Sequence, residues 1–308
     1  MRRFGRVSAI LLVGSCIGAP IGSQEQKPDQ QYQFRVTVDL ISLNVTVTDA
    51  RSRFVTELLQ KDFSVFEDGI AQEVSIFSRE DLPIRLMLLM DTSASMDEKM
   101  TFAQEAAVNF VKTMKEDDLA QVMEFGSKPN VLQPFTGDIE ELVRAIQMTQ
   151  AGGTTSLYNA LYIALKNLSR RREDIRRQAI VVLSDGEDTS SLVSFDQVME
   201  LTKDTDVVIY TISLRKPSAR RGRAFSEAEH VLKKLAEETG GQWFFPNEIQ
   251  ELASVYERIS TELKSQYNLG YVSNNPKRDG SWRRVVVQTA IPDLIVRTKL
   301  GYYAPRTN

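Results

Sequence analysis

The chain has 308 residues, 42% of them hydrophobic and 26% charged, which is typical of a globular protein with one large domain or two smaller ones. A formal net charge of −3 gives no reason to expect nucleic acid as a partner. Cys16 and His230 are the sole cysteine and histidine, so an internal disulfide and a zinc site built from these residue types are excluded. A Ser-His-Asp or Cys-His catalytic site would have to use His230.

The first 23 residues resemble an export signal. Three arginines within the first six residues form a basic start, and the apolar run at 7–17 is too short to remain as a membrane-spanning helix. Two processing routes are open. The segment Val13-Gly14-Ser15-Cys16 resembles the lipobox of bacterial lipoproteins, in which Cys16 is acylated, whereas ordinary cleavage would fall near Ala19 or Ser23. We therefore expect an exported protein that is periplasmic, anchored at the outer membrane or secreted. If Cys16 is acylated, that lipid is the only membrane contact expected. Residues 24–33 are predicted to form a linker.

Residues 34–80 are predicted to form β strands. β-Branched residues alternate with polar ones from 36 to 47, which is typical of a half-buried strand. We expect a turn at 49–53, a short strand at 63–66, a hairpin turn at Glu67-Asp68-Gly69 and a return strand at 72–77.

Residues 84–265 change to alternating strands and helices. Two continuous apolar runs, 86–90 and 179–183, predict strands that are buried on both faces. Further strands are expected at 119–125, 131–132, 207–212 and 242–245, and helices at 99–114, 139–146, 157–168, 195–202, 227–238 and 248–264. This alternation predicts a Rossmann-like α/β domain, with a doubly wound, mostly parallel sheet covered by helices on both faces.

Residues 266–304 return to β structure, with strands expected at 267–272, 284–289 and 294–300. A single pair of hairpins is marginally stable alone. We therefore expect the N- and C-terminal strands to pack together as a small β-sandwich, with the α/β domain inserted between them.

Carboxylate and hydroxyl side chains follow the two apolar strands. The first strand ends in Asp91, with Ser93 and Ser95 just beyond it, and the second is followed by Asp185. In a doubly wound sheet of order 3-2-1-4-5-6 these are strands one and four, which are neighbours, so the two aspartates should meet at the carboxyl edge, where such folds bind ligands. Oxygen ligands of this kind suit Mg²⁺, and also Mn²⁺ or Ca²⁺, rather than a soft metal.

A third loop can join this site. Gly152 and Gly153 permit a close approach of the backbone, and Thr154 can add a hydroxyl. With it, the chain resembles the von Willebrand factor A (VWFA) family, whose metal-ion-dependent adhesion site (MIDAS) is a D-x-S-x-S loop, a later Thr and a later Asp. Read onto this sequence, the site residues are Asp91, Ser93, Ser95, Thr154 and Asp185.

The resemblance implies that both serines bind the metal directly and that the Thr and Asp residues bind it directly or through water. It also implies that one coordination position stays open for an Asp or Glu side chain of a partner protein. A wider resemblance, carried by Val45-Thr46-Val47-Thr48-Asp49, the segment 62–69 and Gly301-Tyr302-Tyr303-Ala304-Pro305, is to the bacterial VWFA-related acidobacterial family.

The function expected first is a metal-dependent protein-binding module with no catalytic residues. Two alternatives stay open. One is a Mg²⁺-dependent hydrolase or phosphatase, although phosphatases of the haloacid dehalogenase type need a second Asp where Ser93 stands, and no Gly-x-x-x-x-Gly-Lys loop is present. The other is a structural envelope protein whose metal only stabilises the fold. Asp97, Glu187 and Asp188 are interpreted as solvated charges at the rim of the site, one of which could tune the metal.

Overall fold

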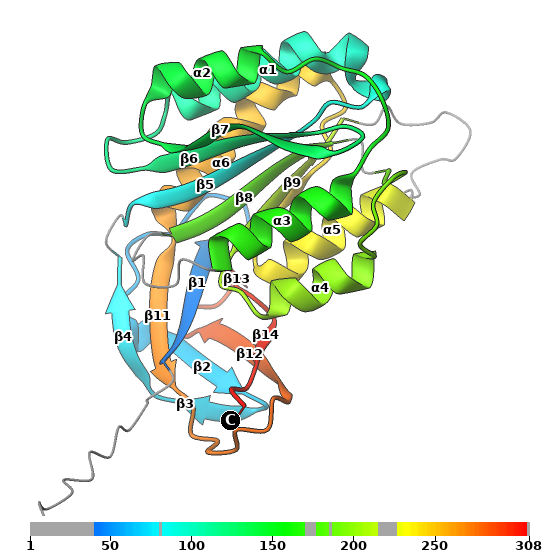
Figure 1. Cartoon of the computed structure of the whole chain (residues 1–308). Helices are drawn as coiled ribbons and strands as arrows, with labels where there is room; N and C mark the ends of the chain where they lie inside the picture. Colours follow the sequence, from blue (N-terminus) through cyan, green and yellow to red (C-terminus); the bar gives the residue numbers. More distant parts are fainter. Residues whose placement is uncertain (1–39, 80–81, 170–176, 185–186, 215–226, 307–308) are drawn as a thin grey trace, which may run out of the picture. The chain divides into compact units, whose positions relative to one another are not determined.

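The computed structural model describes residues 40–306 except for 80–81, 170–176, 185–186 and 215–226 (Figure 1). The predicted signal segment, Cys16, the linker and the predicted start of the first strand lie outside the described residues, as does Asp185. The described residues form a mixed α/β region, which is built around one central sheet, and two further antiparallel sheets of four strands each.

The central sheet has six strands in the order β10-β9-β8-β5-β6-β7. Their bounds are β5 Ile84–Asp91, β6 Leu119–Phe125, β7 Pro129–Thr136, β8 Arg177–Ser184, β9 Val208–Ser213 and β10 Trp243–Phe244. All neighbouring pairs are parallel except β6 and β7. Numbered within this region from β5, the order is 3-2-1-4-5-6, so the predicted doubly wound topology is confirmed.

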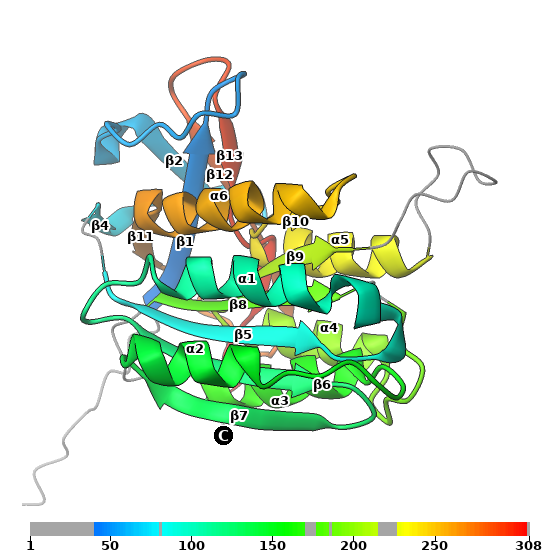
Figure 2. The same ribbon diagram turned by 90° about the horizontal axis from the view of Figure 1, so that it is seen from above.

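Helices cover both faces of this sheet (Figures 1 and 2). One face packs against α1 (Met100–Val111), α2 (Ile139–Gln147) and α6 (Leu252–Ser265). The other packs against α3 (Leu157–Ser169), α4 (Phe195–Lys203) and α5 (Glu227–Thr239). Three short 3-10 helices complete this inventory of the described residues, at η1 (Gln60–Asp62), η2 (Ala94–Lys99) and η3 (Ile249–Glu251).

The two helical layers explain why β5 has a continuous apolar sequence. Leu86, Leu88 and Met90 are buried in the core beneath α1, α2 and α6. Met87 and Leu89 are buried in the opposite core, beneath α3, α4 and α5. Since side chains alternate between the two faces of a strand, a strand covered on both faces has no position that faces water.

The remaining strands form two sheets that each draw on both ends of the described chain. The first has the order β13-β1-β11-β4, with β1 Leu40–Thr48, β4 Val74–Ser78, β11 Tyr267–Val272 and β13 Ile295–Arg297. The second has the order β14-β12-β2-β3, with β2 Phe63–Glu67, β3 Ile70–Gln72, β12 Trp282–Thr289 and β14 Gly301–Tyr303. Their inner faces share one hydrophobic core, so the predicted β-sandwich of N- and C-terminal strands is confirmed.

Two strand predictions for the sandwich are wrong, because each predicted strand is two separate strands in the structure. The return strand expected at 72–77 is split, because Gln72 pairs with Val65 in one sheet whereas Val74 pairs with Tyr271 in the other. The strand expected at 294–300 is likewise split into β13 and β14. The backbone N–H of Leu300, between them, donates to Glu238 O at the end of α5 (3.2 Å), so the chain crosses from one sheet to the other there.

Candidate metal centre

The loop after β5 gathers one carboxylate and two hydroxyls. Asp91 is fully buried at the end of the strand. Its Oδ1 accepts a hydrogen bond from the backbone N–H of Ser93 (2.8 Å), and its Oδ2 accepts one from Ser184 Oγ (2.6 Å). Ser93 Oγ and Ser95 Oγ lie 3.0 Å apart. Ser93 is buried and Ser95 is exposed, so the loop runs from the interior to the surface.

The loop that carries Thr154 is bonded to this loop through the backbone. Gly152 N donates to Thr92 O (2.7 Å), and Ala94 N donates to Gly153 O (3.2 Å). Gly153 has a φ of +79°, a backbone conformation that favours glycine, and a Cβ atom there would lie 2.5 Å from Ser127 Oγ. The structure therefore brings Asp91, Ser93, Ser95 and the Thr154 loop to one edge of the sheet.

Two neighbouring threonines offer a hydroxyl at this edge. Thr154 is exposed, and its Oγ1 donates to Ser127 Oγ (3.2 Å) and Ser190 Oγ (3.0 Å). Thr155 is buried, and its backbone N–H donates to Thr189 Oγ1 (2.9 Å). Thr155 was not among the residues predicted from the sequence, although it carries the same side chain at the adjacent position.

The placement of Asp185 stays a prediction, because that residue lies outside the described residues. Its neighbour Ser184 is the last residue of β8, and β8 pairs directly with β5 through Met90 and Leu183. The bond from Ser184 Oγ to Asp91 joins the ends of these two strands. The prediction that strands one and four are neighbours is thus confirmed as far as Ser184, the residue before Asp185.

The described donors fit a small, hard cation. Ligands at right angles around Mg²⁺, each at about 2.1 Å from the ion, lie about 3.0 Å from each other. Ser93 Oγ and Ser95 Oγ, which are hydrogen-bonded to each other, have this separation of 3.0 Å. Within the described ranges, no group of three or more acidic, histidine or cysteine side chains is suited to a metal ion, so the candidate depends on hydroxyl donors beside the carboxylates.

The acidic residues near the site differ in role. Asp97 and Glu187 are exposed, in keeping with solvated charges at the rim. Asp188 departs from that interpretation, because its Oδ1 accepts from the backbone N–H of Tyr158 (3.1 Å) at the start of α3 and from Ser191 Oγ (2.6 Å). Burial raises the pKa of the Tyr158 phenol, and the carboxylates of Asp188 and Glu227 raise this pKa further.

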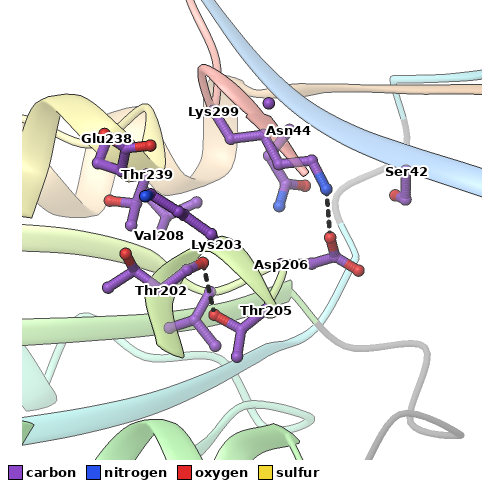
Figure 3. A pocket seen from close by; sticks show the side chains of 12 residues that line it. Ser42, Asn44, Thr202, Lys203, Thr205, Asp206, Val208, Glu238, Thr239 and Lys299 are labelled. Atoms are coloured by element: carbon purple, nitrogen blue, oxygen red, sulfur yellow. Dashed lines mark hydrogen bonds and ion pairs between the residues drawn. The ribbon is translucent and has the colours of Figure 1, made fainter. Parts of the chain in front are cut away.

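One hollow apart from the candidate metal centre is too small to bind a ligand. It lies where β9, α4 and α5 face β1 and the segment before β14, and Figure 3 shows Lys299 reaching across it to Asp206, with 2.5 Å between Nζ and Oδ1. Its volume is about 10 Å³, which admits about one water molecule.

None of the helices in the described ranges has the length and apolar character that a membrane crossing requires.

Comparison with known proteins places this site in a family context. Residues 86–187 match the family model of the von Willebrand factor type A domain. A curated relative, the calcium-activated chloride channel regulator 3A-1 of Mus musculus, is 25% identical over 182 residues, which cover 56% of this chain and 19% of the mouse protein. This chain therefore spans about a fifth of that relative's length. The wider resemblance to the acidobacterial family stays a prediction.

Solved structures show the same fold at low sequence identity. The von Willebrand factor type A protein from Catenulispora acidiphila is 13% identical with a TM-score of 0.52, over 89% of this chain and 76% of that one. Proximal thread matrix protein 1 from the mussel byssus is 15% identical with a TM-score of 0.50, over 64% of this chain and 49% of that one. The latter was solved with a zinc-occupied MIDAS motif.

Proposed function

The chain contains a von Willebrand factor type A domain, and from this premise we propose that it is an exported protein-binding module without catalytic activity. In this proposal a divalent cation is held by Asp91, Ser93, Ser95, Thr154 and Asp185, and an acidic side chain of a partner protein completes its coordination. Mg²⁺ is the ion proposed first, with Mn²⁺ and Ca²⁺ as alternatives.

The observation that carries this proposal is the geometry of the loop after β5. Asp91 has both carboxylate oxygens fixed, one by the backbone of its own loop and one by Ser184. The two serine hydroxyls lie at the separation of adjacent ligands around a small cation. Hydrogen bonds to ligating carboxylates of this kind orient them before a metal binds.

The gradient of burial across the site supports a binding function. Asp91 and Ser93 are buried, whereas Ser95 and Thr154 are exposed, so the inner donors are shielded and the outer ones face solvent. A bound cation would supply a positive centre at this surface, able to accept a carboxylate oxygen from another protein. With Asp91 and Asp185 as its only proposed anionic ligands and neutral hydroxyls in the other positions, the cation would remain electrophilic toward such a carboxylate.

The proposal of export is supported by the N-terminal sequence alone, with its arginines and the apolar run at 7–17. It includes lipidation of Cys16 as one route of attachment to the outer membrane, with release as a periplasmic or secreted protein as the other.

Titration calorimetry with Mg²⁺ and Mn²⁺ tests the site. We expect one metal to bind per chain, and Asp91→Ala to abolish this binding. The control variant Asp138→Ala removes an exposed helix cap remote from the site and should bind metal normally. Unchanged metal affinity in Asp91→Ala would show that the site is assigned wrongly.

The two threonines can be separated in the same assay. Thr154→Val and Thr155→Val each remove one hydroxyl with little change in shape. The proposed assignment expects the larger loss of metal affinity for Thr154→Val. If Thr155→Val causes the larger loss, the buried hydroxyl is the ligand and the assignment moves by one residue.

A pull-down from envelope extract, run with Mg²⁺ and again with EDTA, tests the binding function. We expect a protein that is retained only with Mg²⁺ and is lost with Ser93→Ala. Mg²⁺-dependent phosphatase turnover that disappears with Asp91→Ala would instead favour an enzyme. A metal that raises the melting temperature without any metal-dependent capture would favour a structural role.

A further inference from the structure

Leu192 is the most exposed large hydrophobic side chain in the described residues. It is 96% exposed, and the next in rank, Met148, is 69% exposed. Isolated apolar residues are common on protein surfaces, but the other large apolar side chains in the described residues are at most 69% exposed. Leu192 instead presents nearly all of its side chain to solvent, although its burial would be favourable.

The backbone around Leu192 is fixed by hydrogen bonds. The N–H groups of Leu192 and Val193 both donate to Asn159 Oδ1 (3.2 Å each), and Asn159 N donates to Ser191 Oγ (2.9 Å). Ser191 in turn donates from both its N–H and its hydroxyl to Asp188. Val193 packs against the core beneath α3, α4 and α5. These contacts hold Leu192 outward.

This segment adjoins the candidate metal centre. Ser190 Oγ accepts a hydrogen bond from Thr154 Oγ1 (3.0 Å), and Leu192 is two residues further on. Two residues span at most about 7.6 Å between Cα atoms, so Leu192 lies beside the loop that carries Thr154. Met148 starts the connection from α2 to α3 that carries Thr154 itself. Among the described residues, the two most exposed large apolar side chains thus both belong to loops of this edge, which lies at the right of Figure 1.

We propose that Leu192 is an apolar anchor for the partner, so that the bound segment combines a carboxylate for the metal with an apolar side chain that packs on Leu192. The inference rests on the proposed function, because the metal determines where the carboxylate is placed. The carboxylate supplies the attraction to the cation, and the apolar contact selects among the many exposed acidic residues of other proteins. A fixed loop favours this role because little conformational entropy is lost when it binds.

A library of random twelve-residue peptides displayed on phage provides the probe. It is panned against the purified full-length chain in Mg²⁺, and bound phage are eluted first with EDTA and then with acid, as two separate pools. We expect the enriched peptides to share an acidic residue with an aliphatic or aromatic residue within a few positions. The affinity of one such synthetic peptide is then measured by fluorescence polarisation against wild type, Leu192→Ser and Asp91→Ala.

We expect Leu192→Ser to weaken this peptide about tenfold, equivalent to about 1.4 kcal/mol, with unchanged Mg²⁺ affinity and melting temperature. The matched control Leu59→Ser changes an exposed leucine (49%) next to η1 and should leave peptide affinity unchanged. Equal affinity for wild type and Leu192→Ser would overturn the inference and leave the metal-dependent function standing. Peptides that need Leu192 but survive EDTA would support the apolar contact and contradict the proposed function. Enrichment of no peptide in either pool would contradict both.

Discussion

The environment of Asp91 shows how single contacts prepare the candidate site. This carboxylate is fully buried, and a buried charge is costly unless its oxygens have partners. The N–H of Ser93 and the hydroxyl of Ser184 supply one partner to each oxygen. Ser184 also ties the end of β8 to the end of β5, so it positions Asp91 relative to the strand that leads to Asp185.

Ser184→Ala tests this positioning. The substitution removes the hydrogen bond to Asp91 Oδ2, and loss of such an outer contact typically lowers metal affinity about 10–100-fold. We expect a decrease in this range for Mg²⁺ by titration calorimetry, with the folded state retained. Ser75→Ala serves as control, because it removes a comparable serine hydroxyl in the β-sandwich and should not alter metal affinity. Normal Mg²⁺ affinity in Ser184→Ala would show that Asp91 does not depend on this contact.

The elements of the central sheet could be predicted from sequence because burial on both faces leaves an apolar run. The runs in β5 and β8 identified strands one and four, and their order placed Asp91 near the end of β8. The strands of the sandwich were harder to predict. A chain that leaves one sheet and enters the other keeps its alternation of apolar and polar residues, so the breaks before Val74 and at Leu300 have no clear pattern.

The candidate site was predictable only in part, for a related reason. Asp91, Ser93 and Ser95 form a local motif that can be recognised from spacing. The contacts of Thr154 with Ser127 and Ser190 depend on how three loops meet in space, and no sequence period encodes such a meeting. The exposure of Leu192 depends in the same way on Asn159, 33 positions earlier in the chain.

At the scale of one element, α6 is held by a buried ion pair. Glu262 on α6 has no exposed surface, and its Oε2 lies 2.6 Å from Arg297 Nη2 on β13. Its Oε1 accepts hydrogen bonds from Thr46 on β1 (3.2 Å) and Tyr210 on β9 (3.0 Å). One helical carboxylate therefore binds strands of both the sandwich and the central sheet.

Arg297→Met should destabilise the protein by about 3 kcal/mol, because it leaves the charge of Glu262 buried without its partner. This value is at the low end of the usual range since Arg297 is partly exposed. Adding Glu262→Gln should recover part of the loss, since the amide oxygen can still accept from Thr46 and Tyr210 without a charge. Urea unfolding measures both variants. A double variant no more stable than Arg297→Met would contradict this explanation.

At the scale of the whole described chain, a polar cluster joins strands from both of its ends inside the sandwich. Glu67 on β2 accepts hydrogen bonds from Tyr271 on β11 and Tyr302 on β14 (2.8 Å each), and pairs with Arg283 on β12 (3.2 Å). Glu67 and Arg283 are both buried. Burial by itself raises the pKa of Glu67, but the hydrogen bonds from Ser273, Tyr302 and Tyr271 and the charge of Arg283 outweigh it, so the pKa lies below its ordinary value of 4.5.

This lowered pKa predicts a contribution of Glu67 to acid sensitivity. The ionised carboxylate stabilises the folded state fully above pH 4.5, and this contribution is lost as the pH falls through the lower pKa of the folded protein. We expect the melting temperature of wild type to fall more steeply below pH 4.5 than that of Glu67→Gln, which cannot titrate there. Parallel pH profiles of the two proteins would show that Glu67 does not contribute to this sensitivity.

The most direct test of the metal centre is anomalous diffraction from crystals of the protein grown with Mn²⁺. We predict one strong anomalous peak per chain, within coordination distance of Ser93 Oγ and Ser95 Oγ and between the ends of β5 and β8. Absence of a peak at this edge, or a peak held by other residues alone, would contradict the proposed metal centre.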